Sequence, residues 1–216
     1  MQKIEVLLEK AKVFYDNGDP SHDFAHILRV IENCRRFGAT VNANLELLLP
    51  AAILHDVVNL PKNHPERLQA SQMAGEKSRQ VLSDAGYNEI EIAKIVEIIT
   101  EHSYSLGRKP SSIESAVLQD ADKLDALGAI GIMRTVTCGC RMGSSYYDPS
   151  DPIPNERALN DKAFTVDHFF AKLFKLSALM NTEAAKLEAN QRTQFMKDFL
   201  KQLTEEITPH RKMKPS

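Results

Sequence analysis

The sequence predicts an all-α protein, a compact bundle of helices interrupted by one long loop at about residues 141–163. Apolar residues recur at helical spacing through most of the chain, which indicates amphipathic helices packed on a common core. No stretch alternates between apolar and polar residues for long enough to predict a β-strand. The loop stands apart because prolines and turn-forming residues gather there at a density that excludes a helix.

The helices predicted before this loop are bounded by capping and turn-forming residues. Their expected ranges are residues 4–15, 21–37, 45–58, 66–85 and 89–102. The first four stop at residues that leave the helical region readily or cannot continue a helix, namely Asn17-Gly18, Gly38, Pro61 and Gly86. Ser21 is the expected N-cap of the second helix, because its hydroxyl can accept a hydrogen bond from an N–H group of the first turn.

Further helices are predicted on both sides of the loop, at residues 113–127, 128–138, 166–180 and 182–207. Pro110-Ser111-Ser112 opens the first of them. A loop as long as residues 141–163 is usually either functional or disordered, and we expect it to act as a lid. The tail at about residues 209–216 is expected to fray.

Composition and charge limit the function classes. The formal net charge of −2 gives no global field that would favour nucleic acid or an anionic membrane. No apolar run approaches the ~20 residues of a membrane span, and the N-terminus lacks the shape of a signal peptide. Three cysteines are an odd, sparse set that indicates reduced thiols. We therefore expect one cytoplasmic domain over residues 1–216.

The most informative feature is the adjacent pair His55-Asp56, near the end of the apolar run at residues 47–54. An imidazole and a carboxylate are costly to bury there unless a cation neutralises and orders them. His26 and Asp122 could supply further ligands. Neutral imidazole nitrogens with carboxylate oxygens suit Mn, Fe, Co, Ni, Mg or Zn.

Each candidate ligand has a simpler alternative. His26 alone is more typical of a structural histidine, and Asp122 could form a buried salt bridge with Lys123 or Arg134. The combination favours a metal site, because three predicted helices each place a metal-competent group at a position otherwise suited to the core.

His26, His55-Asp56 and Asp122 reproduce the H…HD…D signature, and with it the chain resembles the HD-domain metal-dependent phosphohydrolases. The likeness extends over nearly the whole chain, through residues 21–30, 54–65, 101–105, 120–131 and 166–173. These segments resemble a bacterial subgroup that includes enzymes similar to nucleoside triphosphate pyrophosphohydrolases. The resemblance implies an HD-domain bundle in which the four residues bind one divalent ion, Mn, Mg, Ni, Co or Fe rather than Zn.

Two branches of this superfamily do not fit. The stringent-response hydrolases carry a Glu-Asp pair where this sequence has Asn59 and Leu60. The cyclic-di-GMP phosphodiesterases carry a Gly-Tyr-Pro motif and ligands for a second metal, and the sequence has neither. A single metal ion is therefore expected.

Catalytic roles are predicted for Asp56, His102 and Asp125. His102 ends a helix and could protonate the leaving group or bind phosphate, although a simple helix C-terminal cation is an equal alternative. Asp125 follows Asp122 by three residues, so it could orient a ligand or the attacking water.

Substrate contacts are predicted at two places. Lys62, Asn63 and His64 follow the HD pair and could bind a polyphosphate, with Lys77 as a further candidate; Lys62 could equally be a solvated loop charge. In the long loop, the adjacent pair Tyr146-Tyr147 could stack on a base.

The expected activity is hydrolysis of a (deoxy)nucleoside triphosphate to monophosphate and pyrophosphate by metal-activated water. Alternatives are a 5'-nucleotidase-like phosphomonoesterase, a phosphodiesterase or, in a different class, a non-catalytic sensor of metal or nucleotide. The expected partner is a small nucleotide, with neither nucleic acid nor membrane involved. The sequence does not decide the oligomeric state, and a homodimer is one of the states it allows.

Overall fold

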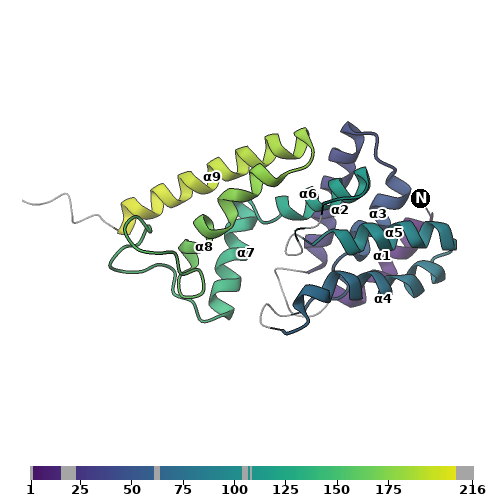
Figure 1. Ribbon diagram of the computed structural model, residues 1–216, viewed down its shortest axis with the longest axis horizontal. Coiled ribbons are helices and arrows are strands. Elements are labelled where there is room, and N and C mark those ends of the chain that lie inside the picture. The colour runs from purple at the N-terminus through teal and green to yellow at the C-terminus, as the bar shows by residue number, and fades with distance from the viewer. Residues whose placement is uncertain (1, 16–22, 61–63, 104–106, 108, 208–216) are drawn as a thin grey trace, which may run out of the picture. The chain divides into compact units, whose positions relative to one another are not determined.

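The computed structural model describes residues 2–15, 23–60, 64–103, 107 and 109–207 (Figure 1). Its helical elements are α1 (Gln2–Tyr15), α2 (Phe24–Thr40), α3 (Leu45–Leu54), η1 (Arg67–Gln69), α4 (Ala70–Asp84), α5 (Glu89–Glu101), α6 (Ile113–Leu124), α7 (Gly128–Arg141), α8 (Thr165–Ala171), η3 (Leu173–Leu179) and α9 (Glu183–Ile207). Within those ranges there is no β-strand, only an isolated bridge between Ser145 and Phe164. The predicted all-α fold class is confirmed.

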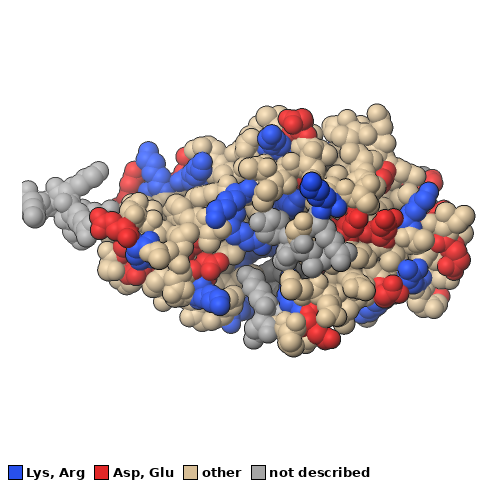
Figure 2. All heavy atoms as spheres, in the orientation of Figure 1, with Lys and Arg blue, Asp and Glu red and all other residues tan. Residues whose placement is uncertain are grey.

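The chain divides into two compact units. One comprises Met1–Asp125 with Asn181–Ala185, and the other comprises Ala126–Met180 with Lys186–Ser216. The expectation of a single domain over residues 1–216 stays a prediction. No helix in the described part of the chain is long and apolar enough to cross a membrane. On the face drawn in Figure 2, Lys and Arg are interspersed with Asp and Glu over both units.

Helix α3 lies at the centre of the first unit, where it contacts α1, α2, α4, α5 and α6. Its sequence, LELLLPAAIL, is apolar apart from the exposed Glu46 in its first turn, as expected of a helix enclosed by others. Every residue from Leu48 to Leu54 is buried. The part of the helix that directly precedes His55-Asp56 is thus enclosed by the core, which gives the pair a rigid base.

Helix α2 begins and ends differently from the prediction. Its N-cap is Asp23, whose side chain accepts a hydrogen bond from the N–H of His26, while the predicted cap Ser21 lies outside the described residues. The helix also continues past Gly38 to Thr40. A Cβ atom at Gly38 would lie 3.1 Å from Leu45 and 3.2 Å from Leu48, so this glycine allows close approach of α3 instead of ending α2.

Two other predicted helices end early. The third stops at Leu54, and the sixth stops at Leu124. Three residues separate Leu124 from Gly128, which begins α7 and has a φ of 73°. The predicted helix at residues 166–180 is divided into α8 and η3 at Lys172, whose φ and ψ are −132° and −57°. The predicted stops at Asn17-Gly18 and Pro61 and the tail at residues 209–216 lie outside the described residues.

In the second unit, the predicted long loop is confirmed as a non-helical segment between α7 and α8. The loop is attached to α8 by Arg157, which donates two hydrogen bonds to the buried Asp167 carboxylate, at 2.5 and 2.6 Å. The guanidinium also lies over the Phe164 ring, 4.9 Å from its centroid. The loop is therefore tied to the unit that contains it, and its role as a lid stays a prediction.

Candidate metal centre

Four predicted ligands converge in the first unit, from the first turn of α2, the end of α3 and the last turn of α6. The Nε2 atom of His26, on α2, lies 3.8 Å from Asp56 Oδ2 and 3.6 Å from Oδ1 of Asp122, on α6. The Nε2 atom of His55 lies 3.7 Å and 4.0 Å from the same two oxygens. Atoms that bind one cation at about 2 Å lie roughly 3 to 4 Å apart. The arrangement thus has the dimensions of a coordination shell.

His55 presents a lone pair to this cluster. It is the C-cap of α3, and its Nδ1 lies 2.9 Å from the carbonyl oxygen of Ala52, so the proton sits on Nδ1. Burial lowers the pKa of His55 to about 4, which keeps the imidazole neutral. Its buried Nε2 makes no hydrogen bond within the described part of the chain. Since buried acceptors normally have partners, the residues fit a divalent cation.

A carboxylate behind His26 fixes the other imidazole. Asp125 Oδ2 lies 2.7 Å from Nδ1 of His26, and the same carboxylate accepts hydrogen bonds from Arg29 Nε at 2.6 Å and Nη2 at 2.9 Å. Asp125 is fully buried. A carboxylate on the second ring nitrogen of a metal-binding histidine sets its tautomer and orientation. Of the two roles predicted for Asp125, these contacts favour orienting a ligand.

His102, the C-cap of α5, lies at the edge of the cluster. Its Nδ1 is 2.6 Å from the Ile99 carbonyl oxygen, and its Nε2 is 3.7 Å from Asp56 Oδ1. Burial lowers the pKa of His102, but the neighbouring Asp56 carboxylate raises it by more, so the net direction is upward. The position fits a group that meets a substrate beside the metal.

For Asp122, the alternative to metal binding is a buried salt bridge with Lys123 or Arg134. Burial raises the pKa of Asp122, yet His55 and His26 lower it to below its ordinary value. The ammonium of Lys123 donates to Gln119 Oε1 at 3.3 Å and lies 4.0 Å from Asp120 Oδ1. These contacts favour the imidazoles as the main partners of Asp122.

The residues predicted to bind the substrate form no cluster like that of the candidate ligands among the residues that the structure describes. Lys62 and Asn63 lie outside the described residues. His64 is half-buried, and its Nδ1 accepts a hydrogen bond from the N–H of Glu66. The ammonium of Lys77 donates to the carbonyl oxygen of Val57, the residue after Asp56.

Tyr146 and Tyr147 belong to the second unit, and the metal cluster belongs to the first. The Tyr146 side chain is 59% exposed and Tyr147 is half-buried. Their predicted stacking on a base stays a prediction.

Sequence reasoning missed three residues that support the site. Arg29 holds Asp125, and Tyr15 donates a hydrogen bond to the carbonyl oxygen of Ile53. Asp120, fully buried on α6, accepts hydrogen bonds from the backbone and side chains of Asn181 and Thr182. Only Asp120 carried a signal, as a second acidic residue in an apolar stretch.

Comparisons with known proteins agree with this geometry. The HD domain family model matches residues 23–127, which contain all four candidate ligands. The uncharacterised protein YpgQ of Bacillus subtilis (strain 168) is 31% identical over 190 residues, which are 86% of this chain and 84% of YpgQ.

Solved structures match over nearly the full length. The crystal structure of B. subtilis YpgQ in complex with ADP is similar with a TM-score of 0.74 and 29% identity, covering 97% of this chain and 98% of that one. An HD-superfamily hydrolase from Bacillus thuringiensis is similar with a TM-score of 0.72 and 34% identity, covering 94% and 96%.

Proposed function

Since this chain belongs to the HD-domain superfamily of hydrolases, we propose that it is a metal-dependent phosphohydrolase that cleaves a (deoxy)nucleoside triphosphate to monophosphate and pyrophosphate. The observation that supports this most directly is the buried Nε2 of His55, which faces two carboxylates and has no hydrogen-bond partner among the described residues. The ADP bound in the YpgQ crystal structure supports a nucleotide as the substrate class.

His26, His55, Asp56 and Asp122 would hold one divalent ion, with Mn, Mg, Ni, Co and Fe all suited to nitrogen and oxygen donors. Such an ion supplies positive charge to the phosphoryl group and lowers the pKa of a water molecule. The protein's part is positioning, because phosphoryl transfer needs in-line geometry and charge more than covalent chemistry. Asp125 and the Ala52 carbonyl fix the two imidazoles for that purpose.

His102 is proposed to act on the substrate side of the centre. Its Nε2 lies beside Asp56, and its Nδ1 proton is held by the carbonyl oxygen of Ile99. In its doubly protonated form the ring also carries a proton on Nε2, which can donate a hydrogen bond to a phosphate oxygen or pass to the leaving oxygen. Lys77, which lies next to the HD segment, and the sequence at residues 62–64 are proposed to contact the remaining phosphates.

Product analysis tests the proposal. The purified protein would be given a panel of nucleoside triphosphates and monophosphates with Mn, Mg, Ni or Co, and pyrophosphate and orthophosphate would be measured separately. We expect pyrophosphate from triphosphates. Orthophosphate from monophosphates would replace the proposal with a phosphomonoesterase, and a lack of turnover with every metal would contradict it.

A matched pair of variants ties the activity to the site. Asp122→Asn should abolish turnover, whereas Asp84→Asn, at the exposed end of α4, should leave it unchanged. A different result would favour a sensor: the wild type turns over no nucleotide, and Asp122→Asn still binds one.

A further inference from the structure

The segment that presents His55 and Asp56 begins where α3 ends. A helix end leaves its last carbonyl groups without N–H partners in the helix, and the carbonyl of Ile53 belongs to that last turn. His55 still has helical φ and ψ angles of −59° and −33°, and the N–H of Val57 bonds to the Leu54 carbonyl at 3.3 Å. The Ile53 carbonyl instead accepts a hydrogen bond from outside α3, from the hydroxyl of Tyr15 at 2.5 Å.

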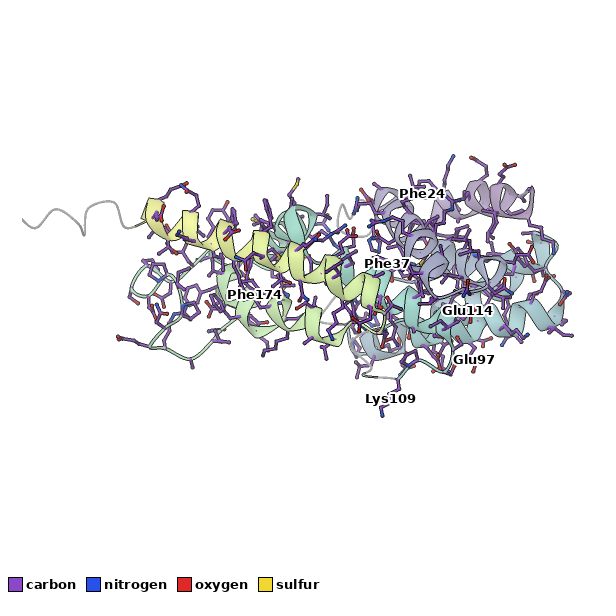
Figure 3. The ribbon with its side chains drawn as sticks, turned by 90° about the horizontal axis from the view of Figure 1, so that it is seen from above. Phe24, Phe37, Glu97, Lys109, Glu114 and Phe174 are labelled. Carbon is purple, nitrogen blue, oxygen red and sulfur yellow. The ribbon has the colours of Figure 1, made fainter. Side chains whose placement is uncertain are left out.

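Tyr15 is the last residue of α1 and is only 3% exposed. Its ring lies against Phe24, the first residue of α2, with the centroids 6.2 Å apart; Phe24 is labelled in Figure 3. The phenol ring is therefore held between the end of α1 and the start of α2, which fixes the direction of its hydroxyl. That direction leads to the turn that follows α3.

Ile53 lies two residues before His55 and three before Asp56. The Tyr15 hydroxyl therefore holds the turn from which both candidate ligands extend.

A helix-end carbonyl that accepts a hydrogen bond from a fixed, buried side chain is held in place, and so is the direction in which the chain leaves the helix. We propose that Tyr15 is a positioning residue of the metal centre, whose hydroxyl holds the turn after α3 so that Asp56 faces His26 and Asp122. The inference rests on the proposed metal site.

The contribution comes from outside the part of the chain that matches the HD domain family model, which begins at residue 23. Helix α1 contacts α3 in the first unit, and through Tyr15 it would set the geometry of a ligand that the HD motif itself supplies. Loss of a group that orients a metal ligand typically weakens metal binding by about 10- to 100-fold.

Cobalt binding tests this without relying on turnover. Visible absorption of bound Co²⁺ reports both affinity and ligand geometry. For Tyr15→Phe, which keeps the ring and removes the hydrogen bond to the Ile53 carbonyl, we expect affinity to fall by about 10- to 100-fold and the spectrum to change. Tyr87→Phe is the matched control, because Tyr87 is also buried in the first unit, and it should bind like the wild type. Incorporating 4-aminophenylalanine at position 15 should restore part of the affinity.

The outcomes separate the two proposals. Wild-type affinity and spectrum in Tyr15→Phe would overturn the positioning role alone, whereas a wild type that binds no divalent metal would overturn the metal site together with it. If Tyr15→Phe does not fold, hydrogen exchange in the wild type decides the matter. Because coupling between sites is reciprocal, Mg²⁺ should slow exchange of the Tyr15 hydroxyl proton, and unchanged exchange would refute the role.

Discussion

Replacing Asp125 by asparagine removes the negative charge that lies between His26 and Arg29. The carboxylate accepts two hydrogen bonds from Arg29 and faces Nδ1 of His26 at 2.7 Å. Asparagine keeps one acceptor oxygen, and its NH₂ group must face one of these donors. At least one donor therefore loses its partner, and the remaining bonds lose their ionic character.

The magnitude follows from those contacts. Hydrogen bonds to charged groups contribute about 1.5 to 3 kcal/mol each. The Arg29 side chain is 33% exposed, so water can replace its lost hydrogen bonds. We therefore take the contribution of these bonds at the low end of that range. We expect Asp125→Asn to lower the free energy of unfolding by about 2 to 4 kcal/mol. Metal affinity should fall by about 10- to 100-fold, because His26 loses its fixed tautomer.

Asp120→Asn is the control, since Asp120 is also fully buried on α6 but bonds to Asn181 and Thr182 instead of a candidate ligand. It should lose comparable stability in denaturant titrations while keeping wild-type metal affinity in calorimetry. If both variants lose affinity equally, or if Asp125→Asn binds metal normally, the assignment of Asp125 to His26 is refuted.

Three other predictions concern stability. A divalent metal at 100 times its dissociation constant should raise the free energy of unfolding by about 2.7 kcal/mol; thermal melts with and without chelator measure this, and Asp122→Asn should abolish the rise. Gly139→Ala should lower the free energy of unfolding by about 1 to 3 kcal/mol in denaturant titrations, because a Cβ there would overlap Thr165; an unchanged midpoint would contradict this. Burial raises the pKa of Asp167, but Arg157 and the Asn160 amide together lower it by more, so the pKa lies below its ordinary value. Its contribution to stability should therefore be complete above about pH 4 and be lost as the pH falls through the lowered pKa; denaturation midpoints between pH 5 and 2 should fall less steeply in Asp167→Asn.

The candidate metal ligands could be singled out in the sequence because their conflict with the surroundings is local. His55-Asp56 stands at the end of an apolar run, and Asp122 lies in a second one, so each is visible without knowledge of the fold. Tyr15 and Arg29 gave no such signal. A tyrosine at the end of an amphipathic helix and an arginine one turn after His26 are ordinary in sequence, and only the packing of α1 on α3 and of α2 on α6 gives them partners.

Helix boundaries show the same limit. Gly86 ends α4 as predicted and has a φ of 82°, whereas Gly38 stays helical and its missing side chain makes room for Leu45 and Leu48. Both roles follow from the absence of a Cβ atom. Which one applies depends on whether another helix lies against the glycine, and that information is not local.

Helix α6 and its C-cap residue Asp125 carry three aspartates in three directions, toward Asn181 and Thr182, toward the two imidazoles, and toward Arg29. A shift of one residue along the helix would turn each carboxylate by about 100° and separate all three from their partners at once. The chain from Ile113 to Leu124 therefore has a single register in which its charges are satisfied. Insertions or deletions within α6 should be far less tolerated than substitutions at its exposed first residue, Ile113.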